Sequence, residues 1–344
     1  MALESSIYAF WVAKQSAKGS VIAGVAATKR PVVVSGDLTV NRADGSEMFS
    51  DLDRFGDQTD YVNTIVGEGS LGIEGSPDVA AYICWLFFGQ ESVTGMADPY
   101  THTFTPGTNG GFWSTWWKRL GQNVIQRQKF GDCRIGGLTI EGSTGSKVVR
   151  LTPSLLSLAP GVTYASPDPT PSLPTEEPFL YTEGRGTYTI NGVVFTGQSQ
   201  FTATWDEGRG PYYGDDVVPA DLVEGTASIG IATTFLVDQA GKDEFDRQIY
   251  GTTSPTAGAT PLKDLPAIGS YTFTLTKRDA SGALTPARTF VLTIPGVKWA
   301  PDLAIPPSPS GGAVELSLGG SMRKVAGQPA STIAIQNGVA AYTT

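Results

Sequence analysis

The sequence predicts a mainly β protein with two tandem β-sandwich or barrel domains, each flanked by one α-helix. Its 42 glycines and 23 prolines favour strands and turns over long helices. In several segments polar and apolar residues alternate, as in strands with one buried face and one solvent-exposed face. These segments recur in the same order in the second half, which indicates an internal duplication.

The chain divides into four expected regions. Residues 1–30, which carry an aromatic patch, form an N-terminal docking arm. Residues 31–156 form the first domain and residues 180–344 the second. Between them, residues 157–179 carry six prolines in a polar stretch, a composition typical of an extended linker.

The first domain begins with a strand over residues 31–42, in which Leu38 and Val40 face the core. Residues 43–60 follow. They are acidic and too many for a plain hairpin turn, so we expect a functional or interfacial loop.

A strand, a turn and one buried helix occupy residues 61–90. Ser76 is the expected N-cap whose side chain accepts a backbone N–H, Pro77 suits the first helical position, and Asp78 suits the helix dipole. Residues 79–88 are apolar on every side, so the helix must be covered, and Gly89 closes it.

Two strands, residues 132–141 and 147–156, end the first domain. The apolar face changes parity at Gly136 and Gly137, which predicts a β-bulge. Before them lie a Thr-rich strand over residues 100–105 and an aromatic segment over residues 112–120.

The second domain repeats this order. Phe201, Ala203 and Trp205 alternate with polar residues, and an acidic loop over residues 206–221 follows. The remaining elements that we match to the first domain are a strand over 224–231, a helix over 243–250, a strand over 271–274 matched to 100–105, and two closing strands over 290–304 and 313–325.

Composition argues against several classes of function. A formal charge of −9 disfavours wrapping nucleic acid, because phosphate binding needs clustered Lys and Arg, but nucleic acid could still pass by. Cys84 and Cys133 are expected to be buried free thiols. No apolar run suits a membrane span or a signal peptide, so we expect synthesis and first use in a cytoplasm.

Catalytic and ligand-binding motifs are weak. His102, the only histidine, lies in a Thr-rich strand without a nearby acid or nucleophile pattern. Residues 67–72 match a dinucleotide-binding pattern but fall inside an alternating strand. Residues 51–62 begin like a calcium loop and then fail at Phe55 and Val62. We therefore predict a protein that is not an enzyme and has no catalytic residue, cofactor or metal.

Three tryptophans give an alternative reading. Trp113, Trp116 and Trp117 could stack on sugars in a carbohydrate-binding or adhesive two-domain β-sandwich protein. Alternation puts Trp116 on the face opposite the other two, so core or interface packing is the preferred prediction.

In the order of its segments, the chain resembles the major tail tube proteins of long-tailed bacteriophages with non-contractile tails (siphophages). The resemblance covers most of the chain. It is carried by the strand over residues 33–42 with its acidic loop, the strand–helix unit ending at Gly89, the Thr-rich residues 100–106, and the strands over 132–140 and 148–152.

The resemblance implies a structural protein of the virion tail, assembled in the host cytoplasm. Members fold as two packed β-sheets with a helix, and six tube domains close a ring with a continuous inner β-barrel. A duplicated chain would need three copies per ring, with six as the alternative. The implied partners are further copies of the chain, the tape measure protein, the tail terminator and tail tip proteins, and DNA that passes without specific binding. No membrane is implied.

Strand alternation then gives the residues expected to line the lumen of such a tube. They are Asp37, Thr39, Asn41, Glu68, Ser70 and Glu74 in the first domain, and Gln198, Gln200, Thr202, Thr204, Glu224, Thr226 and Ser228 in the second. The two acidic loops are expected to reach the next ring. Their candidate residues are Asp44, Asp51, Asp53, Arg54, Asp57, Arg209, Tyr212, Tyr213, Asp215 and Asp216.

Overall fold

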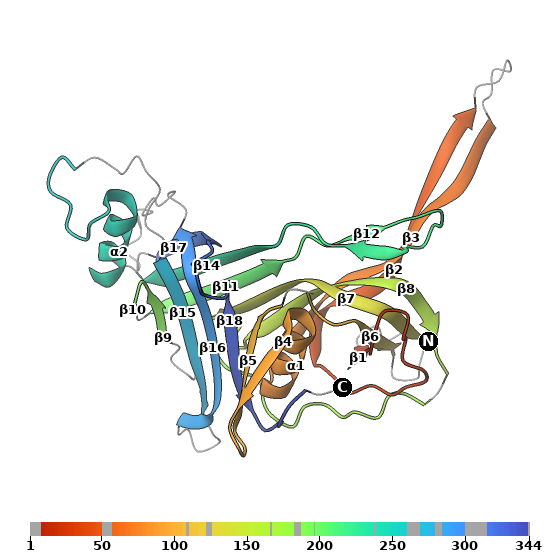
Figure 1. Ribbon diagram of the computed structural model, residues 1–344, viewed down its shortest axis with the longest axis horizontal. Coiled ribbons are helices and arrows are strands. Elements are labelled where there is room, and N and C mark those ends of the chain that lie inside the picture. The colour runs from red at the N-terminus through yellow and green to blue at the C-terminus, as the bar shows by residue number, and fades with distance from the viewer. Residues whose placement is uncertain are drawn as a thin grey trace.

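The computed structural model describes residues 8–49, 57–107, 110–121, 126–165, 167–181, 187–195, 197–236, 239–259, 269–278, 284–299 and 315–342. Within these residues the chain is mainly β, as predicted. One large antiparallel sheet runs through both halves of the sequence (Figure 1).

The described elements of the first half are β1 (Tyr8–Lys14), β2 (Val33–Phe49), β3 (Asp57–Glu74), α1 (Pro77–Phe88), β4 (Gly89–Thr94), β5 (Tyr100–Pro106), β6 (Ser114–Leu120), β7 (Gln126–Ser143) and β8 (Arg150–Thr163). Those of the second half are β9 (Thr187–Ile190), β10 (Val193–Phe195), β11 (Gln198–Asp206), β12 (Gly210–Tyr212), β13 (Asp221–Val223), β14 (Ser228–Leu236), α2 (Gln239–Tyr250), β15 (Gly269–Arg278), β16 (Leu284–Trp299), β17 (Glu315–Met322) and β18 (Thr332–Asn337).

Both halves pair their strands in the same order. In the first half the order across the sheet is β2, β3, β8, β7, and in the second half it is β11, β14, β17, β16. The flanking strands also match, because β6 pairs with β7 and β1 with β6, whereas β15 pairs with β16 and β9 with β15. A helix follows the second strand of each set.

This order corrects one of the sequence matches. The strand over residues 271–274 lies in β15, whose counterpart by pairing is β6 and not the Thr-rich β5. β5 instead pairs with β4 and with β18, an element that the sequence did not predict. The match was wrong because a Thr-rich composition is typical of any half-buried strand. It does not indicate which strand lies next to it.

The two sets of strands join edge to edge. β7 pairs with β11 over residues 137–143 and 200–206, so the sheet continues from one half into the other without a break. The β-bulge predicted at Gly136 and Gly137 is confirmed by a shift of register between β7 and β8, directly before this junction.

Helix α1 forms where the sequence predicts it. Its residues are buried except Asp78, and Gly89 closes it in the left-handed conformation, with its N–H donated to Trp85. One detail was wrong: Ser76 has the extended backbone of an N-cap, but its side chain makes no capping hydrogen bond. The Ser76 hydroxyl is buried and makes no hydrogen bond in the structure.

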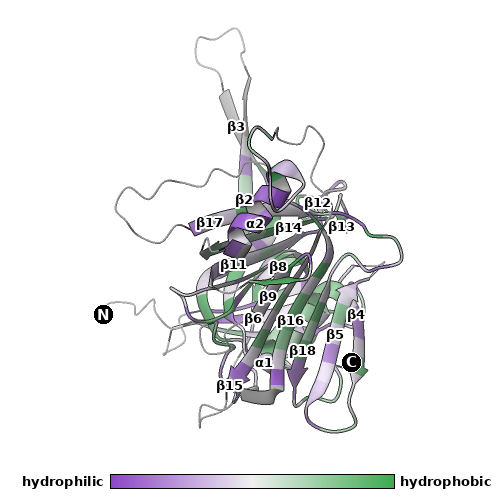
Figure 2. Cartoon of the chain, turned by 90° about the vertical axis from the view of Figure 1, so that its left-hand side faces the viewer, coloured by the Kyte–Doolittle hydropathy of each residue, from purple (hydrophilic) through white to green (hydrophobic). Residues whose placement is uncertain are grey.

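Helix α2 begins at Gln239, four residues before the predicted Asp243, and ends at the predicted Tyr250. Hydrophilic residues dominate it (Figure 2). Its buried Glu244 accepts hydrogen bonds from Arg247 (2.6 Å) and from Asn191 (3.2 Å) in the turn between β9 and β10. α2 therefore covers an edge of the sheet, whereas α1 lies in the core.

The predicted acidic loop over residues 43–60 is mostly a β-hairpin. β2 continues to Phe49 and β3 begins at Asp57, and the two strands pair over this whole length. This hairpin, the β2–β3 arm, projects beyond the rest of the molecule in both views (Figures 1 and 2). The loop prediction was wrong because a polar composition does not distinguish a loop from two paired strands.

The second acidic loop also contains strands. β12 and β13 form a separate two-stranded hairpin, the β12–β13 arm, which lies along the first half. Ile65 of β3 donates its N–H to the carbonyl of Val217 at 2.8 Å, which ties this arm to the base of the β2–β3 arm.

The two segments predicted to be arm and linker pack against the first half. β1 of the N-terminal segment pairs with β6 and buries Phe10, Trp11 and Val12. The linker prediction began too early, because β8 extends to Thr163. The segment that follows, which contains Asp168, Pro171 and Glu176 and which we call the strap, crosses β1 and β6. Trp11 donates its indole N–H to the Pro171 carbonyl of the strap (3.2 Å).

Candidate functional site

The sheet has one apolar and one polar face, which is the alternation the sequence predicts. Leu38, Phe201 and Trp205, which occupy apolar positions of the predicted alternation, are buried. The apolar residues of β3 and β14 that alternate with polar ones are buried too, namely Leu71, Ile73, Ile229 and Ile231. Val40 is the exception, at 38% exposed. β2 leaves the core after Leu38 to enter the β2–β3 arm, so the alternation continues where no core remains to cover it.

Hydroxyl groups cross the polar face from strand to strand. Thr139 of β7 lies opposite Thr152 of β8 on one side and Thr204 of β11 on the other. The Thr139 and Thr204 hydroxyls are 3.3 Å apart, and those of Thr234 and Ser317 are 2.9 Å apart. These hydroxyl contacts between neighbouring strands make the face polar, both at the junction between the halves and between β14 and β17.

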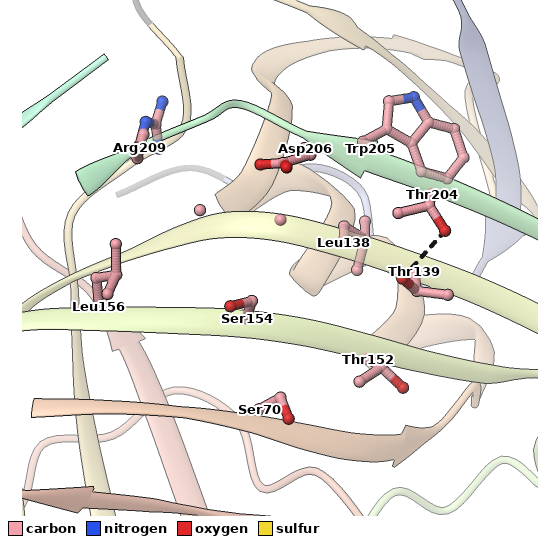
Figure 3. Close-up of a pocket in the computed structure, with 12 residues that line it drawn as sticks. Ser70, Leu138, Thr139, Thr152, Ser154, Leu156, Thr204, Trp205, Asp206 and Arg209 are labelled. Carbon is pink, nitrogen blue, oxygen red and sulfur yellow. Dashed lines mark hydrogen bonds between the residues drawn. The ribbon is translucent and has the colours of Figure 1, made fainter. Parts of the chain in front are cut away.

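A shallow hollow of about 400 Å³ lies at this junction, beside the bulge in β7. Figure 3 shows Ser70, Thr139, Thr152, Ser154 and Thr204 along its wall, contributed by four neighbouring strands. Its described lining contains Asp206 and Arg209 at one end, and the Arg209 side chain continues into a cluster of charges. Hydroxyls arranged in this way can form hydrogen bonds with solvent or with another molecule at the hollow.

The charge cluster, which we call the clamp, consists of Glu207, Arg209, Arg134 and Glu224. Arg209 is 1% exposed, pairs with Glu207 and donates to the Ile135 carbonyl at 3.0 Å. Arg134 reaches Glu224 at 3.3 Å and donates to the Gly111 carbonyl at 2.7 Å. Burial raises the pKa of Glu207, although Arg209 acts in the opposite direction. The clamp fixes the base of the β12–β13 arm on the first half.

The first-half lumen candidates share one face of β2 and β3, because Asp37 lies opposite Ser70 and Thr39 opposite Glu68. Asn41 donates to Glu68 at 2.7 Å. Asp37 pairs with the almost buried Lys118 of β6 at 2.7 Å, a partner that sequence spacing does not reveal. Glu74, next to Arg150 of β8 in register, is half-buried.

The second-half candidates divide into two groups. Gln200, Thr202, Thr204 and Ser228 lie at partly or fully exposed positions of β11 and β14. Gln198 is buried and donates to Thr233 (2.6 Å) and Tyr271 (3.0 Å), because a register shift between Gln198 and Gln200 turns it inward. Glu224 and Thr226 were wrongly placed in a strand, since β14 begins only at Ser228.

The residues predicted to connect stacked rings occupy different kinds of position in the structure. Asp44 is exposed on β2 and pairs with Arg42 at 2.6 Å. Asp51, Asp53 and Arg54 lie outside the described residues, and Asp57 begins β3. Tyr212, Tyr213, Asp215 and Asp216 lie in or next to the tip of the β12–β13 arm, whereas Arg209 is the buried centre of the clamp and not a surface residue.

His102 is buried in a structural role between β4, β5 and the C-terminal segment. Its Nδ1 lies 2.5 Å from Glu91 and its Nε2 lies 2.7 Å from the Val339 carbonyl. Sequence spacing does not reveal the Glu91 contact, which arises only when β4 pairs with β5. With no exposed ring nitrogen, His102 is not placed to react with a substrate.

The remaining sequence motifs also have structural positions. Trp116 and Trp117 are fully buried in two different clusters, as the alternation predicted, so neither can stack on a sugar. Cys84 and Cys133 are confirmed as buried free thiols, and burial raises the pKa of Cys133 to about 12. Residues 67–72 lie inside β3, as predicted.

Two kinds of feature are absent from the described residues. They contain no group of three or more His, Cys, Asp or Glu side chains arranged to hold a metal ion. None of their helices has the length and apolar character needed to span a membrane.

No family model matches the chain, and no curated protein matches it.

Proposed function

We propose that this protein is the structural subunit of a bacteriophage tail tube, of the non-contractile, long-tailed type. Three copies form a ring, rings stack into a tube, and the tube encloses the tape measure protein before it conducts the genome. The observation that supports this most strongly is the repeated strand order of the two halves, joined edge to edge by β7 and β11.

This junction is a contact that further copies can repeat. Each half contributes a set of four antiparallel strands, and the combined order of the two sets runs from β2, an edge strand, to β16. β16 pairs with β15 as far as Val297, and beyond Val297 no described strand pairs with it on that side. Because the number of strands is even, β16 of one copy and β2 of the next run antiparallel, as β7 and β11 do. In a closed ring no such edge remains exposed to aggregate.

The two tandem tube domains of this proposal correspond to the two strand sets, and three chains supply six of them. Six chains per ring remains the alternative stoichiometry. The polar face of the sheet lines the tube, and the apolar face packs on α1 and the outer strands.

The chemistry of the polar face suits passage of DNA. Near the junction it presents paired hydroxyls, and nearby charges occur in pairs such as Arg134 with Glu224. DNA binding grows with the number of phosphates that Lys and Arg neutralise, so a neutral or acidic wall does not hold the duplex. The proposed role is mechanical and not enzymatic.

The proposed partners follow from the same assembly. The β2–β3 arm contacts the next ring, and the ends of the tube meet the tail terminator and tail tip proteins. The protein is located in the virion tail after assembly in the host cytoplasm.

Electron microscopy and native mass spectrometry of the purified full chain test the proposal. Rings or tubes with three chains per ring are expected. Rings of six chains would overturn the stoichiometry. A chain that stays monomeric at all concentrations and salt conditions would overturn the function.

A further inference from the structure

The contact between the halves inside one chain defines a register that can be transferred to the contact between two chains. Within the chain, Thr139 of β7 lies opposite Thr204 of β11. If β16 and β2 of neighbouring copies repeat this contact, the residues equivalent to Thr139 and Thr204 must lie opposite each other.

The equivalent of Thr204 follows from the repeated sequence in β3 and β14. Gly72 and Ile73 match Gly230 and Ile231. Gly72 pairs with Ser35 of β2, and Gly230 pairs with Thr204 of β11. Ser35 is therefore the first-half equivalent of Thr204.

The equivalent of Thr139 follows through the third strand of each set. Ile73 pairs with Leu151 of β8, and Ile231 pairs with Gly320 of β17, so these two residues are equivalent. The next residues along, Thr152 and Ser321, pair with Thr139 and with Lys298 of β16. Lys298 is therefore the second-half equivalent of Thr139.

Burial supports this alignment independently of the pairing. The neighbours of Thr139 are Leu138 and Ile140, and those of Lys298 are Val297 and Trp299. All four neighbours are buried in the core. Lys298 thus occupies the polar face, as Thr139 does.

We propose that β16 of one copy pairs with β2 of the next copy in the register that places Lys298 opposite Ser35. This contact rests on the proposed ring, and it names the residues by which one copy recognises the next.

The state of both edges in the single chain fits such a contact. Among the described strands β2 pairs with β3 alone, and Val34, next to Ser35, is 42% exposed. On β16, the pairing with β15 stops at Val297, directly before Lys298. Lys118 binds the Leu38 carbonyl on β2 at 3.2 Å, so the open part of that edge precedes Leu38.

The register also brings opposite charges together. Asp37 lies two residues from Ser35 on the same face of β2, in a diagonal position relative to Lys298 of the neighbouring copy. Asp37 already binds Lys118. Lys298 would therefore meet an acid at the contact instead of facing the lumen as an unpaired cation.

Disulfide trapping tests the register. The variant S35C/K298C is oxidised after assembly and separated without reductant. Covalent dimers and trimers are expected, because each copy contributes one cysteine to each of two contacts. Cys84 and Cys133 are buried and free, so they give little background.

Two matched variants serve as controls. T139C/T204C places the same pair inside one chain and should give an internal disulfide without covalent dimers. S35C/S321C moves one cysteine to the next strand, roughly 5 Å further away, and should give no cross-link.

The outcomes separate the register from the function. Rings that form without a cross-link in S35C/K298C, or that cross-link equally in S35C/S321C, overturn the register and leave the tube intact. If wild-type chains form no ring, the proposed function fails and the contact fails with it. If only the double variant fails to assemble, a mixture of S35C and K298C chains tests the same pair, and absence of a covalent dimer overturns it.

Discussion

The two arms of the molecule occupy the same place in the repeat and behave differently. The β2–β3 arm connects the first two strands of its set and projects away from the sheet (Figure 1). The β12–β13 arm connects β11 and β14 and is held on the first half by the clamp and by the Ile65 to Val217 hydrogen bond.

The difference has a simple cause in the proposed assembly. The second half has a neighbour within its own chain, on which its arm can lie. The first half has no such neighbour until another copy binds to β2. The β12–β13 arm thus shows how one set of strands contacts the next within the chain. In the proposed assembly, the β2–β3 arm is the one that contacts another ring.

The largest expected effect comes from placing a charge in the core of either half. I73K and I229K each bury an ammonium without a partner, which costs several kcal/mol and should prevent folding. Circular dichroism and urea unfolding of both variants measure the loss. A stable, folded I73K would show that the apolar and polar faces have been interchanged.

Removal of the clamp should have the next largest effect. R209L leaves Glu207 without its partner and should lower the free energy of unfolding by about 3 kcal/mol. The double variant E207L/R209L removes both charges and should recover much of this loss. Equal losses in the two variants would mean that Arg209 acts through packing and not through its charge.

Acid should loosen the strap between the halves. Burial alone would raise the pKa of Asp168, but Arg127 and Arg119 together hold it below its ordinary value. The stability that Asp168 contributes is therefore present above about pH 4 and is lost as the pH falls through the lowered pKa. D168N should be less stable than wild type at pH 7, and the difference in thermal unfolding should shrink as the pH falls through the lowered pKa of Asp168.

The other end of the strap gives a comparison for this experiment. Glu176 and Asp98 both pair with Arg288 of the second half, at 2.6 and 2.8 Å. Asp98 is the more exposed of the two, so solvent screens its pair. D98N should accordingly change the acid dependence less than D168N.

Shortening the projecting arm should hardly change stability and should abolish stacking. Replacing residues 45–61 by Asn-Gly keeps Asp44 opposite Val62 and closes the strands with a two-residue turn. Single rings should still form, without tubes, in electron micrographs. Tubes of normal length would show that this arm does not connect the rings.

The smallest effect on stability is expected from the polar face. E68K replaces a carboxylate that binds only Asn41 among its described hydrogen-bond partners, so folding and tubes should persist. A Lys ring in the lumen should bind duplex DNA at low salt and release it as salt rises. A filter-binding assay on purified tubes, with E68Q as control, measures this, and salt-independent binding would contradict it.

Local features were predictable from the sequence because they depend on neighbours in the chain. The proline, acid and apolar run from Pro77 to Phe88 specified a covered helix, and Gly89 specified its end. The change of parity at Gly136 and Gly137 specified the bulge. Alternation placed Leu38, Phe201 and Trp205 in the core, because successive side chains on a strand point to opposite faces.

Tertiary structure alone decided which strands are neighbours and which polar side chains become buried or paired. Composition could not distinguish a loop from a pair of strands in the β2–β3 arm, nor predict the register shift that buries Gln198. The contacts of Asp37 with Lys118 and of His102 with Glu91 join residues from different strands. The free energy of strand pairing depends on the neighbouring strand, and the sequence of one strand does not identify that neighbour.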